Sequence, residues 1–376
     1  MKKFFVIAAA AIALAACSKS EVSSSAPDKA VTFEVANYVS PVTKVNVSFG
    51  TSNTFHTNAW VHTLVNGLEK TQEFMETETV AWNATEKQWM PSRVYFWPKT
   101  GYVNFFSYAG SIDPSATAEN SITYTNAPID VDDDILVADA AYEYTGNTST
   151  YHFDDAGVTG VPTLFHHVLS KVSFNVKLDA TDAIPDDKYE WEVVVDESKF
   201  GYVNKGTVAF TFADGQSADV SSPVANTQSW NAPTGDFAWT IVSNNSGSEL
   251  ESVVTGDSNK MTATNAAKVS EAKTLFNEVS VVPQDLSATG AHAQFSLTYT
   301  IKSTYKVDPA DDTTWKSVTE TVTVPLTDIL SYVPSITGWK MNYKYIYNIT
   351  IKPGEPVRFD PAVVDWESET ATEKVI

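Results

Sequence analysis

The chain has 376 residues with 46 acidic and 25 basic side chains, a formal net charge of −21. This acidity argues against nucleic-acid binding and against electrostatic adhesion to anionic membranes, because both targets are negatively charged. One hydrophobic core seldom serves so long a chain, and 12% aromatic residues with abundant threonine, valine and serine favour strands, so we expect two all-β domains.

The N-terminal residues 1–17 have the features of a bacterial lipoprotein signal. Two lysines precede an apolar run that is too short to span a bilayer of about 30 Å, and residues 14–17 (LAAC) form a lipobox. Cys17 is the single cysteine of the chain and, at the end of the lipobox, the predicted lipid attachment point. Several acyl chains on this one residue would anchor the protein more firmly than one chain. A plain secretory signal with an incidental cysteine is the less favoured alternative.

A serine-rich, charged spacer over residues 18–30 leads into the first strand candidate. Val31, Phe33 and Val35 alternate with polar residues, which is the pattern of a half-buried strand. A second alternating run begins at Val45, after a loop that holds Lys44. Exposed loops of this kind are where proteases cut.

The next informative stretches are aromatic and acidic. Residues 50–90 are polar with isolated tryptophans, whereas residues 95–110 (YFWPKTGYVNFFSYAG) predict two short aromatic strands joined by a turn at residues 98–101. Rings at strand spacing are expected to fill a core and not to form a sugar-stacking platform. Residues 130–134 (DVDDD) lack the EF-hand spacing, so a solvated turn before a strand at 135–138 is expected in place of a calcium site.

Two adjacent histidines, His166 and His167, precede a run at residues 171–178 that alternates throughout. Neighbouring side chains on a strand point to opposite faces, so the pair does not readily share one metal ion. We expect one of them to be a hydrogen-bonded structural histidine, and we expect no metal or cofactor.

Short alternating runs with turn residues between them continue to the C-terminus, which predicts antiparallel β-sandwiches. Residues 266–276 and 326–332 suggest short helices. The alternating runs are residues 191–195, 207–212, 237–241, 293–301, 318–324 and 343–351.

Several sequence segments, spread in order over nearly the whole chain, are informative when they are taken together. They are the lipobox leader, residues 95–110, residues 165–177 (FHHVLSKVSFNVK), residues 282–284 (VPQ) and residues 343–366 (YKYIYNITIKPGEPVRFDPAVVDW). Together they resemble the fimbrillins of Bacteroidia, the type V pilus subunits. The resemblance implies two tandem antiparallel β-sandwich domains of transthyretin-like type, here over residues 31–162 and 163–376, and no enzymatic activity.

The resemblance also implies proteolytic processing. A lipid-anchored precursor reaches the outer membrane, where a trypsin-like protease cuts after a basic residue in the first loop. Residues 31–39, with Val31, Phe33 and Val35, resemble the displaced strand, and Lys44 takes the place of the cleavage residue, where arginine is commoner. Lys29 is a weaker candidate, because a cut there leaves the strand attached.

The vacated groove is expected to accept a donor strand from the next subunit, which satisfies unpaired backbone groups and apolar pockets together. Such a contact is head-to-tail and builds a cell-surface fimbrium for adhesion. Residues 357–376 resemble the donor arm of a shaft subunit; in a tip subunit they stay in their own domain. The expected partners are other pilin subunits, the processing protease and a host or bacterial surface target. The arm residues are Val357, Phe359, Val363 and Trp366.

Two other functions stay open. A monomeric surface glycan-binding lipoprotein would use tryptophans such as Trp60, Trp89 or Trp97, if their rings were exposed in one cleft. An enzyme such as a glycosidase needs two carboxylates at a fixed separation, and the sequence gives no reason to choose a pair. Separately, Thr313 lies in an Asp-Thr-Thr match to a bacterial O-glycosylation acceptor.

Overall fold

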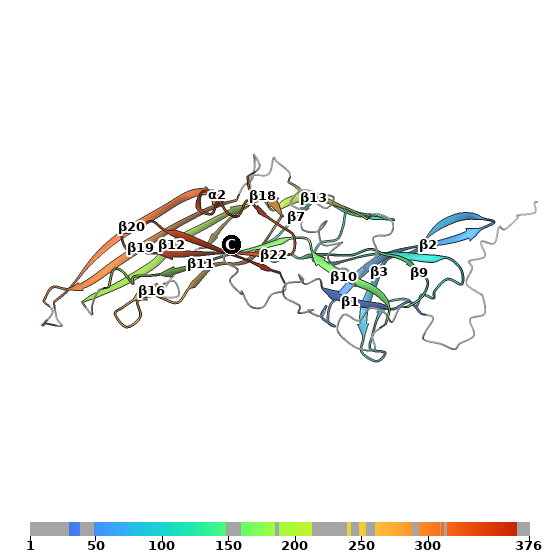
Figure 1. The fold of residues 1–376 in the computed structure, drawn as a ribbon, viewed down its shortest axis with the longest axis horizontal. Coiled ribbons are helices and arrows are strands. Elements are labelled where there is room, and N and C mark those ends of the chain that lie inside the picture. The colour runs from blue at the N-terminus through green and yellow to red at the C-terminus, as the bar shows by residue number, and fades with distance from the viewer. Residues whose placement is uncertain are drawn as a thin grey trace, which may run out of the picture.

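The computed structural model describes residues 30–37, 49–147, 159–184, 188–212, 239–241, 248–252, 260–287, 293–308, 310–311 and 314–366. The described residues are nearly all strands and turns, which confirms the all-β prediction, and their single helix is α2 (Ile329–Tyr332). Figure 1 shows an elongated body with the early strands in blue at one end and the late strands in orange at the other. No helix among the described residues is long and apolar enough to cross a bilayer.

A long β-hairpin opens the N-terminal half. It consists of β2 (Thr54–Val65) and β3 (Leu68–Asn83), joined at Asn66 and Gly67. Both turn residues have positive φ, 53° and 77°, a conformation that the Asn-Gly pair favours in tight hairpins. The sequence prediction treated this stretch as polar with isolated anchors, and the Asn-Gly turn was the signal that it missed.

The strands of the N-terminal half close into a ring. The order β2-β3-β4-β1-β10-β8-β5 returns to its start because β5 also pairs with β2, and β9 adds to β5. The ring encloses a core of aromatic and aliphatic side chains, called the first core below. The remaining bounds are β1 (Phe33–Asn37), β4 (Gln88–Pro91), β5 (Tyr102–Gly110), β8 (Ile135–Ala138), β9 (Ala141–Tyr144) and β10 (Val161–His167).

A second sheet, in the order β14-β13-β7-β6, packs against the β5 and β8 side of the ring through a middle core. It pairs β7 with β13, two strands that lie on opposite sides of the predicted domain boundary at residue 162, and that boundary falls inside β10. The division into two domains therefore stays a prediction. The bounds are β6 (Ala116–Ala118), β7 (Ser121–Pro128), β13 (Lys205–Thr211) and β14 (Thr240–Ile241).

The C-terminal half is a sandwich of two sheets. The sheet β17-β11-β22-β23 faces the sheet β15-β12-β19-β20, and β16 pairs with β12. Phe174 of β11 stacks on Phe295 of β19 with ring centroids 4.5 Å apart, at the centre of this last core. The bounds are β11 (Ser170–Leu178), β12 (Tyr189–Tyr202), β15 (Ser248–Ser252), β16 (Lys260–Ala263), β17 (Lys273–Val281), β18 (Gln284–Asp285), β19 (Gln294–Lys306), β20 (Trp315–Asp328), β21 (Gly338–Trp339), β22 (Tyr343–Ile351) and β23 (Arg358–Asp365).

Three local predictions need correction. The helix expected over residues 266–276 is wrong, because Val269 forms a single bridge with Asp179 and β17, which pairs with β11, begins at Lys273. The second expected helix shrinks to α2, since β20 continues to Asp328. Only the second half of the aromatic block is a strand, β5, whereas residues 95–97 form a single bridge at Phe96.

Candidate functional site

The first strand, β1, lies inside the ring and not at its edge. It pairs in parallel with β10, from Phe33 opposite Val161 to Asn37 opposite Phe165. On its other side Phe33 pairs with Trp89 of β4. Removing β1 would therefore open the ring between β4 and β10 and leave two facing strand edges.

The side chains of β1, and of Val31 just before it, pack into the first core. Phe33 is fully buried, Val31 is 1% exposed and Val35 is 7% exposed. The ring of Phe33 makes edge-to-face contacts with Phe55 at 5.4 Å and Phe105 at 5.6 Å between centroids. Burying such side chains stabilises the fold by about 1.5–3 kcal/mol each. A chain without β1 would expose an apolar slot.

Asn147 holds the start of β1 from the side. Its Nδ2 donates to the carbonyl of Ala30 at 2.8 Å, and its Oδ1 accepts from the N–H of Thr32 at 3.2 Å. The indole N–H of Trp97 donates to the same Oδ1 at 3.0 Å. One carboxamide thus makes the pair of hydrogen bonds that a neighbouring strand would make.

Glu78 fixes the segment that flanks β1 on the β4 side. Its carboxylate accepts from the Ser92 hydroxyl at 2.5 Å, from the Arg93 guanidinium at 2.8 Å and from the Tyr95 hydroxyl at 2.9 Å. Burial alone would raise the pKa of Glu78, but these hydrogen bonds outweigh it and lower that pKa. The carbonyl of Tyr95 in turn accepts from the N–H of Val31 at 2.8 Å.

Gly160 lets β1 approach from the β10 side. A Cβ atom at this position would lie 2.5 Å from the backbone N of Phe33 and from backbone atoms of Thr32. The Thr32 carbonyl accepts from the N–H of Val161 at 2.8 Å, directly beside this contact. Only glycine leaves room for the backbone of β1 here.

Covalently, β1 is joined to the rest of the fold through residues 38–48. Phe49, the next described residue, is 2% exposed and stacks on Phe165 at 5.0 Å in the first core. A single cut within residues 38–48 would therefore leave Phe49 anchored and β1 held by non-covalent contacts. Lys44 and Val39 lie outside the described residues, as do Cys17 and Lys29.

The predicted donor arm is folded onto its own chain as β23. This strand pairs with β22 from Arg358 opposite Thr350 to Asp365 opposite Tyr343, and it ends the order β17-β11-β22-β23. Phe359 is half-buried and stacks on Tyr332 with centroids 4.4 Å apart, while Val357 and Val363 also pack against the last core.

Trp366, the last described residue of the arm, packs in a different core. It is 5% exposed and belongs to the middle core. Its ring stacks on His167 with centroids 4.4 Å apart, and Nζ of Lys171 lies 4.7 Å from its centroid. The backbone N–H of Trp366 donates to the carbonyl of Asn342 at 3.0 Å. The described part of the arm, residues 357–366, is thus an edge strand followed by one aromatic anchor.

A family model described as fimbrillin-like matches residues 43–366. The chain belongs to the fimbrillin-like family. No protein of curated function matches it. Membership of this family confirms the resemblance and assigns the chain a structural, non-enzymatic role as a subunit of cell-surface fimbriae, in contact with other pilin subunits.

Solved structures that resemble this fimbrillin-like chain differ greatly from it in sequence. A candidate cell adhesion protein from Bacteroides uniformis is 15% identical over 91% of this chain and 100% of that one, with a TM-score of 0.39. The fimbrial anchor protein Mfa2 from Porphyromonas gingivalis is 9% identical over 90% and 97%, with a TM-score of 0.30. The tip fimbrial protein Mfa3 from the same organism is 10% identical over 84% and 94%, with a TM-score of 0.31.

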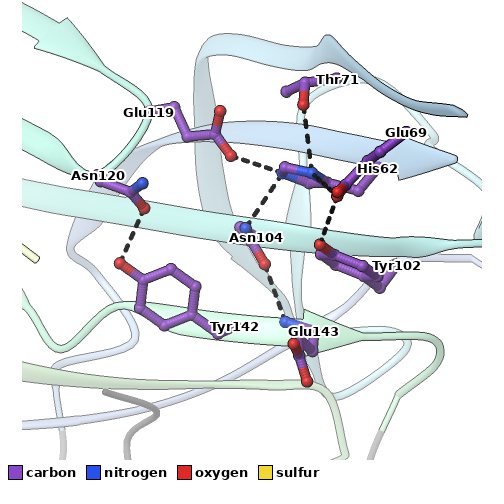
Figure 2. A network of polar contacts seen from close by, with 9 residues as sticks. All are labelled: His62, Glu69, Thr71, Tyr102, Asn104, Glu119, Asn120, Tyr142 and Glu143. Atoms are coloured by element: carbon purple, nitrogen blue, oxygen red, sulfur yellow. Dashed lines mark hydrogen bonds and ion pairs between the residues drawn. The ribbon is translucent and has the colours of Figure 1, made fainter. Parts of the chain in front are cut away.

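The fimbrillin-like chain also contains a polar network away from β1, drawn in Figure 2. Nδ1 of His62 lies 2.9 Å from Oε1 of Glu69, and Nε2 lies 2.5 Å from Oε1 of Glu119. Hydrogen bonds from Tyr102 and His62 lower the pKa of Glu69. The network ties the β2–β3 hairpin to β5 and to the turn between β6 and β7. Within the described residues, no group of three or more potential ligands could hold a metal ion.

The two neighbouring histidines of β10 contact different carboxylates. Nδ1 of His167 lies 2.8 Å from Asp134, and Nε2 of His166 lies 3.2 Å from Asp139. The prediction of a hydrogen-bonded structural histidine is confirmed for His167. In the acidic turn, Asp133 accepts from the N–H of Asp130 at 2.6 Å, and β8 begins at once after Asp134.

The tryptophans considered for glycan binding pack into cores. Trp89 is 3% exposed in the first core, where Trp97 also packs in a half-buried position. Trp60 is half-buried against the middle core, with its ring 5.5 Å from Phe106. The three rings do not form an exposed platform, so the glycan-binding alternative gains no support from them.

Proposed function

We propose that this chain is exported as a lipoprotein anchored at Cys17 and becomes a fimbrial subunit when a trypsin-like protease cuts after Lys44. The cut releases β1, and the open slot between β4 and β10 receives a strand from the next subunit. The arm with Val357, Phe359, Val363 and Trp366 is the donor in a shaft subunit. Repeated exchange builds a surface filament for adhesion.

One observation supports this proposal most strongly: β1 is a central strand whose covalent link to Phe49 and the strands that follow runs through residues 38–48. Its backbone is paired on both sides, and Val31, Phe33 and Val35 are buried. A strand supplied by another subunit satisfies the same backbone groups and apolar pockets. The edge position of β23 also supports the proposal, because an edge strand can leave its sheet without splitting it.

Limited trypsin treatment of the full chain in mild detergent tests the proposal. We expect a cut after Lys44, loss of the fragment with residues 30–37, and ladders that resist SDS on gels. Lys44→Gln should block both the cut and the ladders, and Lys44→Arg should restore both, because trypsin accepts either basic residue.

Two outcomes would count against the proposal in different ways. Ladders that form equally well in Lys44→Gln would show that assembly does not need this cut. A clean cut with release of β1 but without ladders would remove donor-strand exchange between copies of this chain. In that case the slot would need a strand from a different subunit, as in a tip position.

A further inference from the structure

The outermost strand of the C-terminal sandwich has a free side. β20 ends the order β15-β12-β19-β20, and within the described residues only β19 pairs with it. Its residues 316–321 are all exposed. In Figure 1, β19 and β20 reach to the far end of the body. A free edge presents unpaired N–H and C=O groups that another strand can complete.

The exposed part of β20 carries an apolar residue between two opposite charges. The register aligns Val318 with Ser303 of β19, which in turn aligns with Trp191 of β12. Side chains alternate along a strand, so Lys316 and Glu320 share the face of Val318, one on each side. Val318 is 59% exposed, so its side chain is accessible to a partner strand.

This pattern is self-complementary in an antiparallel pair. When two copies of β20 pair around Val318, each Lys316 lies opposite Glu320 of the other copy, and Val318 lies opposite Val318. Pairing centred on Lys316 or on Glu320 would put like charges opposite each other, which destabilises a strand pair. A register centred on Ser317 or on Thr319 places both charged side chains opposite uncharged residues. One register is therefore favoured.

The local charge and the end of the strand fit this register. Regular pairing with β19 reaches Val324, after which Pro325 lies in a bulge, and proline has no N–H to offer a partner.

From Trp315 to Val324 the strand has one lysine and one glutamate, so its net charge is zero in a chain whose net charge is −21. Repulsion between two copies is thus weakest here, and physiological salt screens charges beyond about 8 Å.

We propose that β20 pairs with β20 of a second copy of this chain, antiparallel and centred on Val318, so that two sandwiches share a continuous sheet. The contact is isologous and two-fold symmetric, unlike the head-to-tail contact of strand exchange. It uses neither β1 nor β23, so it is independent of the proposed function. In a filament it would join subunits side by side.

Sedimentation velocity of the uncut full chain in mild detergent, over a wide concentration range, tests this contact. The wild-type chain should form dimers as its concentration rises. Lys316→Glu or Glu320→Lys alone puts like charges opposite each other twice, and each should weaken dimerisation roughly tenfold. An equal mixture of the two variants pairs opposite charges again and should restore dimers, as should the double swap in one chain.

Lys302→Glu is the matched control, because Lys302 lies opposite Thr319 and so on the other face of the sheet. It makes the same change in net charge as Lys316→Glu and should leave dimerisation near the wild-type level. A wild-type chain that stays monomeric overturns the proposal. So do single swaps that dimerise like the wild type, a mixture that fails to restore dimers, or a control as weak as Lys316→Glu. Since Lys316 and Glu320 are exposed, circular dichroism should show every variant folded.

Discussion

The strands nearest to the two ends of the described chain, β1 and β23, are held in opposite ways. β1 is paired on both sides, and every residue from Ala30 to Ala36 is buried. β23 pairs only with β22, and Arg358 and Asp360 are exposed on it. Removal of β1 would leave a slot one strand wide, whereas removal of β23 would leave only a new edge. Under the proposed exchange, β1 therefore marks the place that receives a strand, and β23 is the strand that leaves.

The sharpest way to break this comparison is to truncate one phenylalanine on each strand. Phe33→Ala removes a fully buried ring and should lower the free energy of unfolding by about 3–5 kcal/mol. Phe359→Ala removes a half-buried ring and should cost about half as much, near 2 kcal/mol. Urea unfolding of both variants measures the difference. Equal costs would mean that β1 is no more deeply seated than β23.

A substitution at Gly160 tests the close approach of β1. Gly160→Ala places a Cβ 2.5 Å from the backbone of β1 and should cost about 1–3 kcal/mol. Faster amide exchange at residues 31–36 should accompany the loss, because β1 must move outward. Gly146→Ala is the control, since a Cβ there meets nothing within 4 Å. Unchanged amide exchange in Gly160→Ala would show that a Cβ at residue 160 fits without moving the backbone of β1.

The Asn147 carboxamide is expected to contribute less. Asn147→Ala removes its hydrogen bonds to Ala30 and Thr32 and should lower stability by about 1–2 kcal/mol. Asn147→Asp keeps an acceptor for Thr32 but places a second oxygen against the Ala30 carbonyl, so it should be no more stable than the alanine variant. Thermal unfolding compares the three chains. An aspartate variant as stable as the wild type would contradict the two-sided role of this side chain.

The smallest effect concerns pH at the β4 flank of β1. Because the pKa of Glu78 is lowered in the folded chain, its contribution is complete above its ordinary pKa of 4.5 and is lost as the pH falls through the lower folded value. The wild type should therefore lose stability more steeply than Glu78→Gln as the pH falls below about 5. Glu76→Gln, an exposed neighbour, should follow the wild type. If the stabilities of the wild type and Glu78→Gln fell in parallel with pH, the ionised Glu78 carboxylate would not stabilise the folded chain.

Local patterns in the sequence predict much of this fold. Val31, Phe33 and Val35 alternate in sequence and point into one core as predicted for a strand. The alternation of residues 171–178 likewise predicts β11, because it depends only on neighbours in the chain. The Asn-Gly turn could have predicted the β2–β3 hairpin. Its two strands, however, are longer than the polar sequence suggests.

Contacts between distant segments were out of reach. The closed ring depends on β1 meeting β10 in parallel, and no local pattern specifies the partner or direction of a strand. Asn147, Gly160 and Glu78 are ordinary loop or strand residues in sequence, and their roles arise only where the chain returns to β1. The position of Trp366 between His167 and Lys171 is of the same kind.

The most direct test of the central claim is the binding of a donor peptide to the slot of β1. A labelled peptide of residues 357–366 is added to the full chain before and after trypsin cuts at Lys44, and binding is followed by fluorescence anisotropy. We predict binding only after the cut, with loss of binding when an unlabelled peptide of residues 30–39 competes. Equal binding to the uncut chain, or none to the cut chain, would contradict the account.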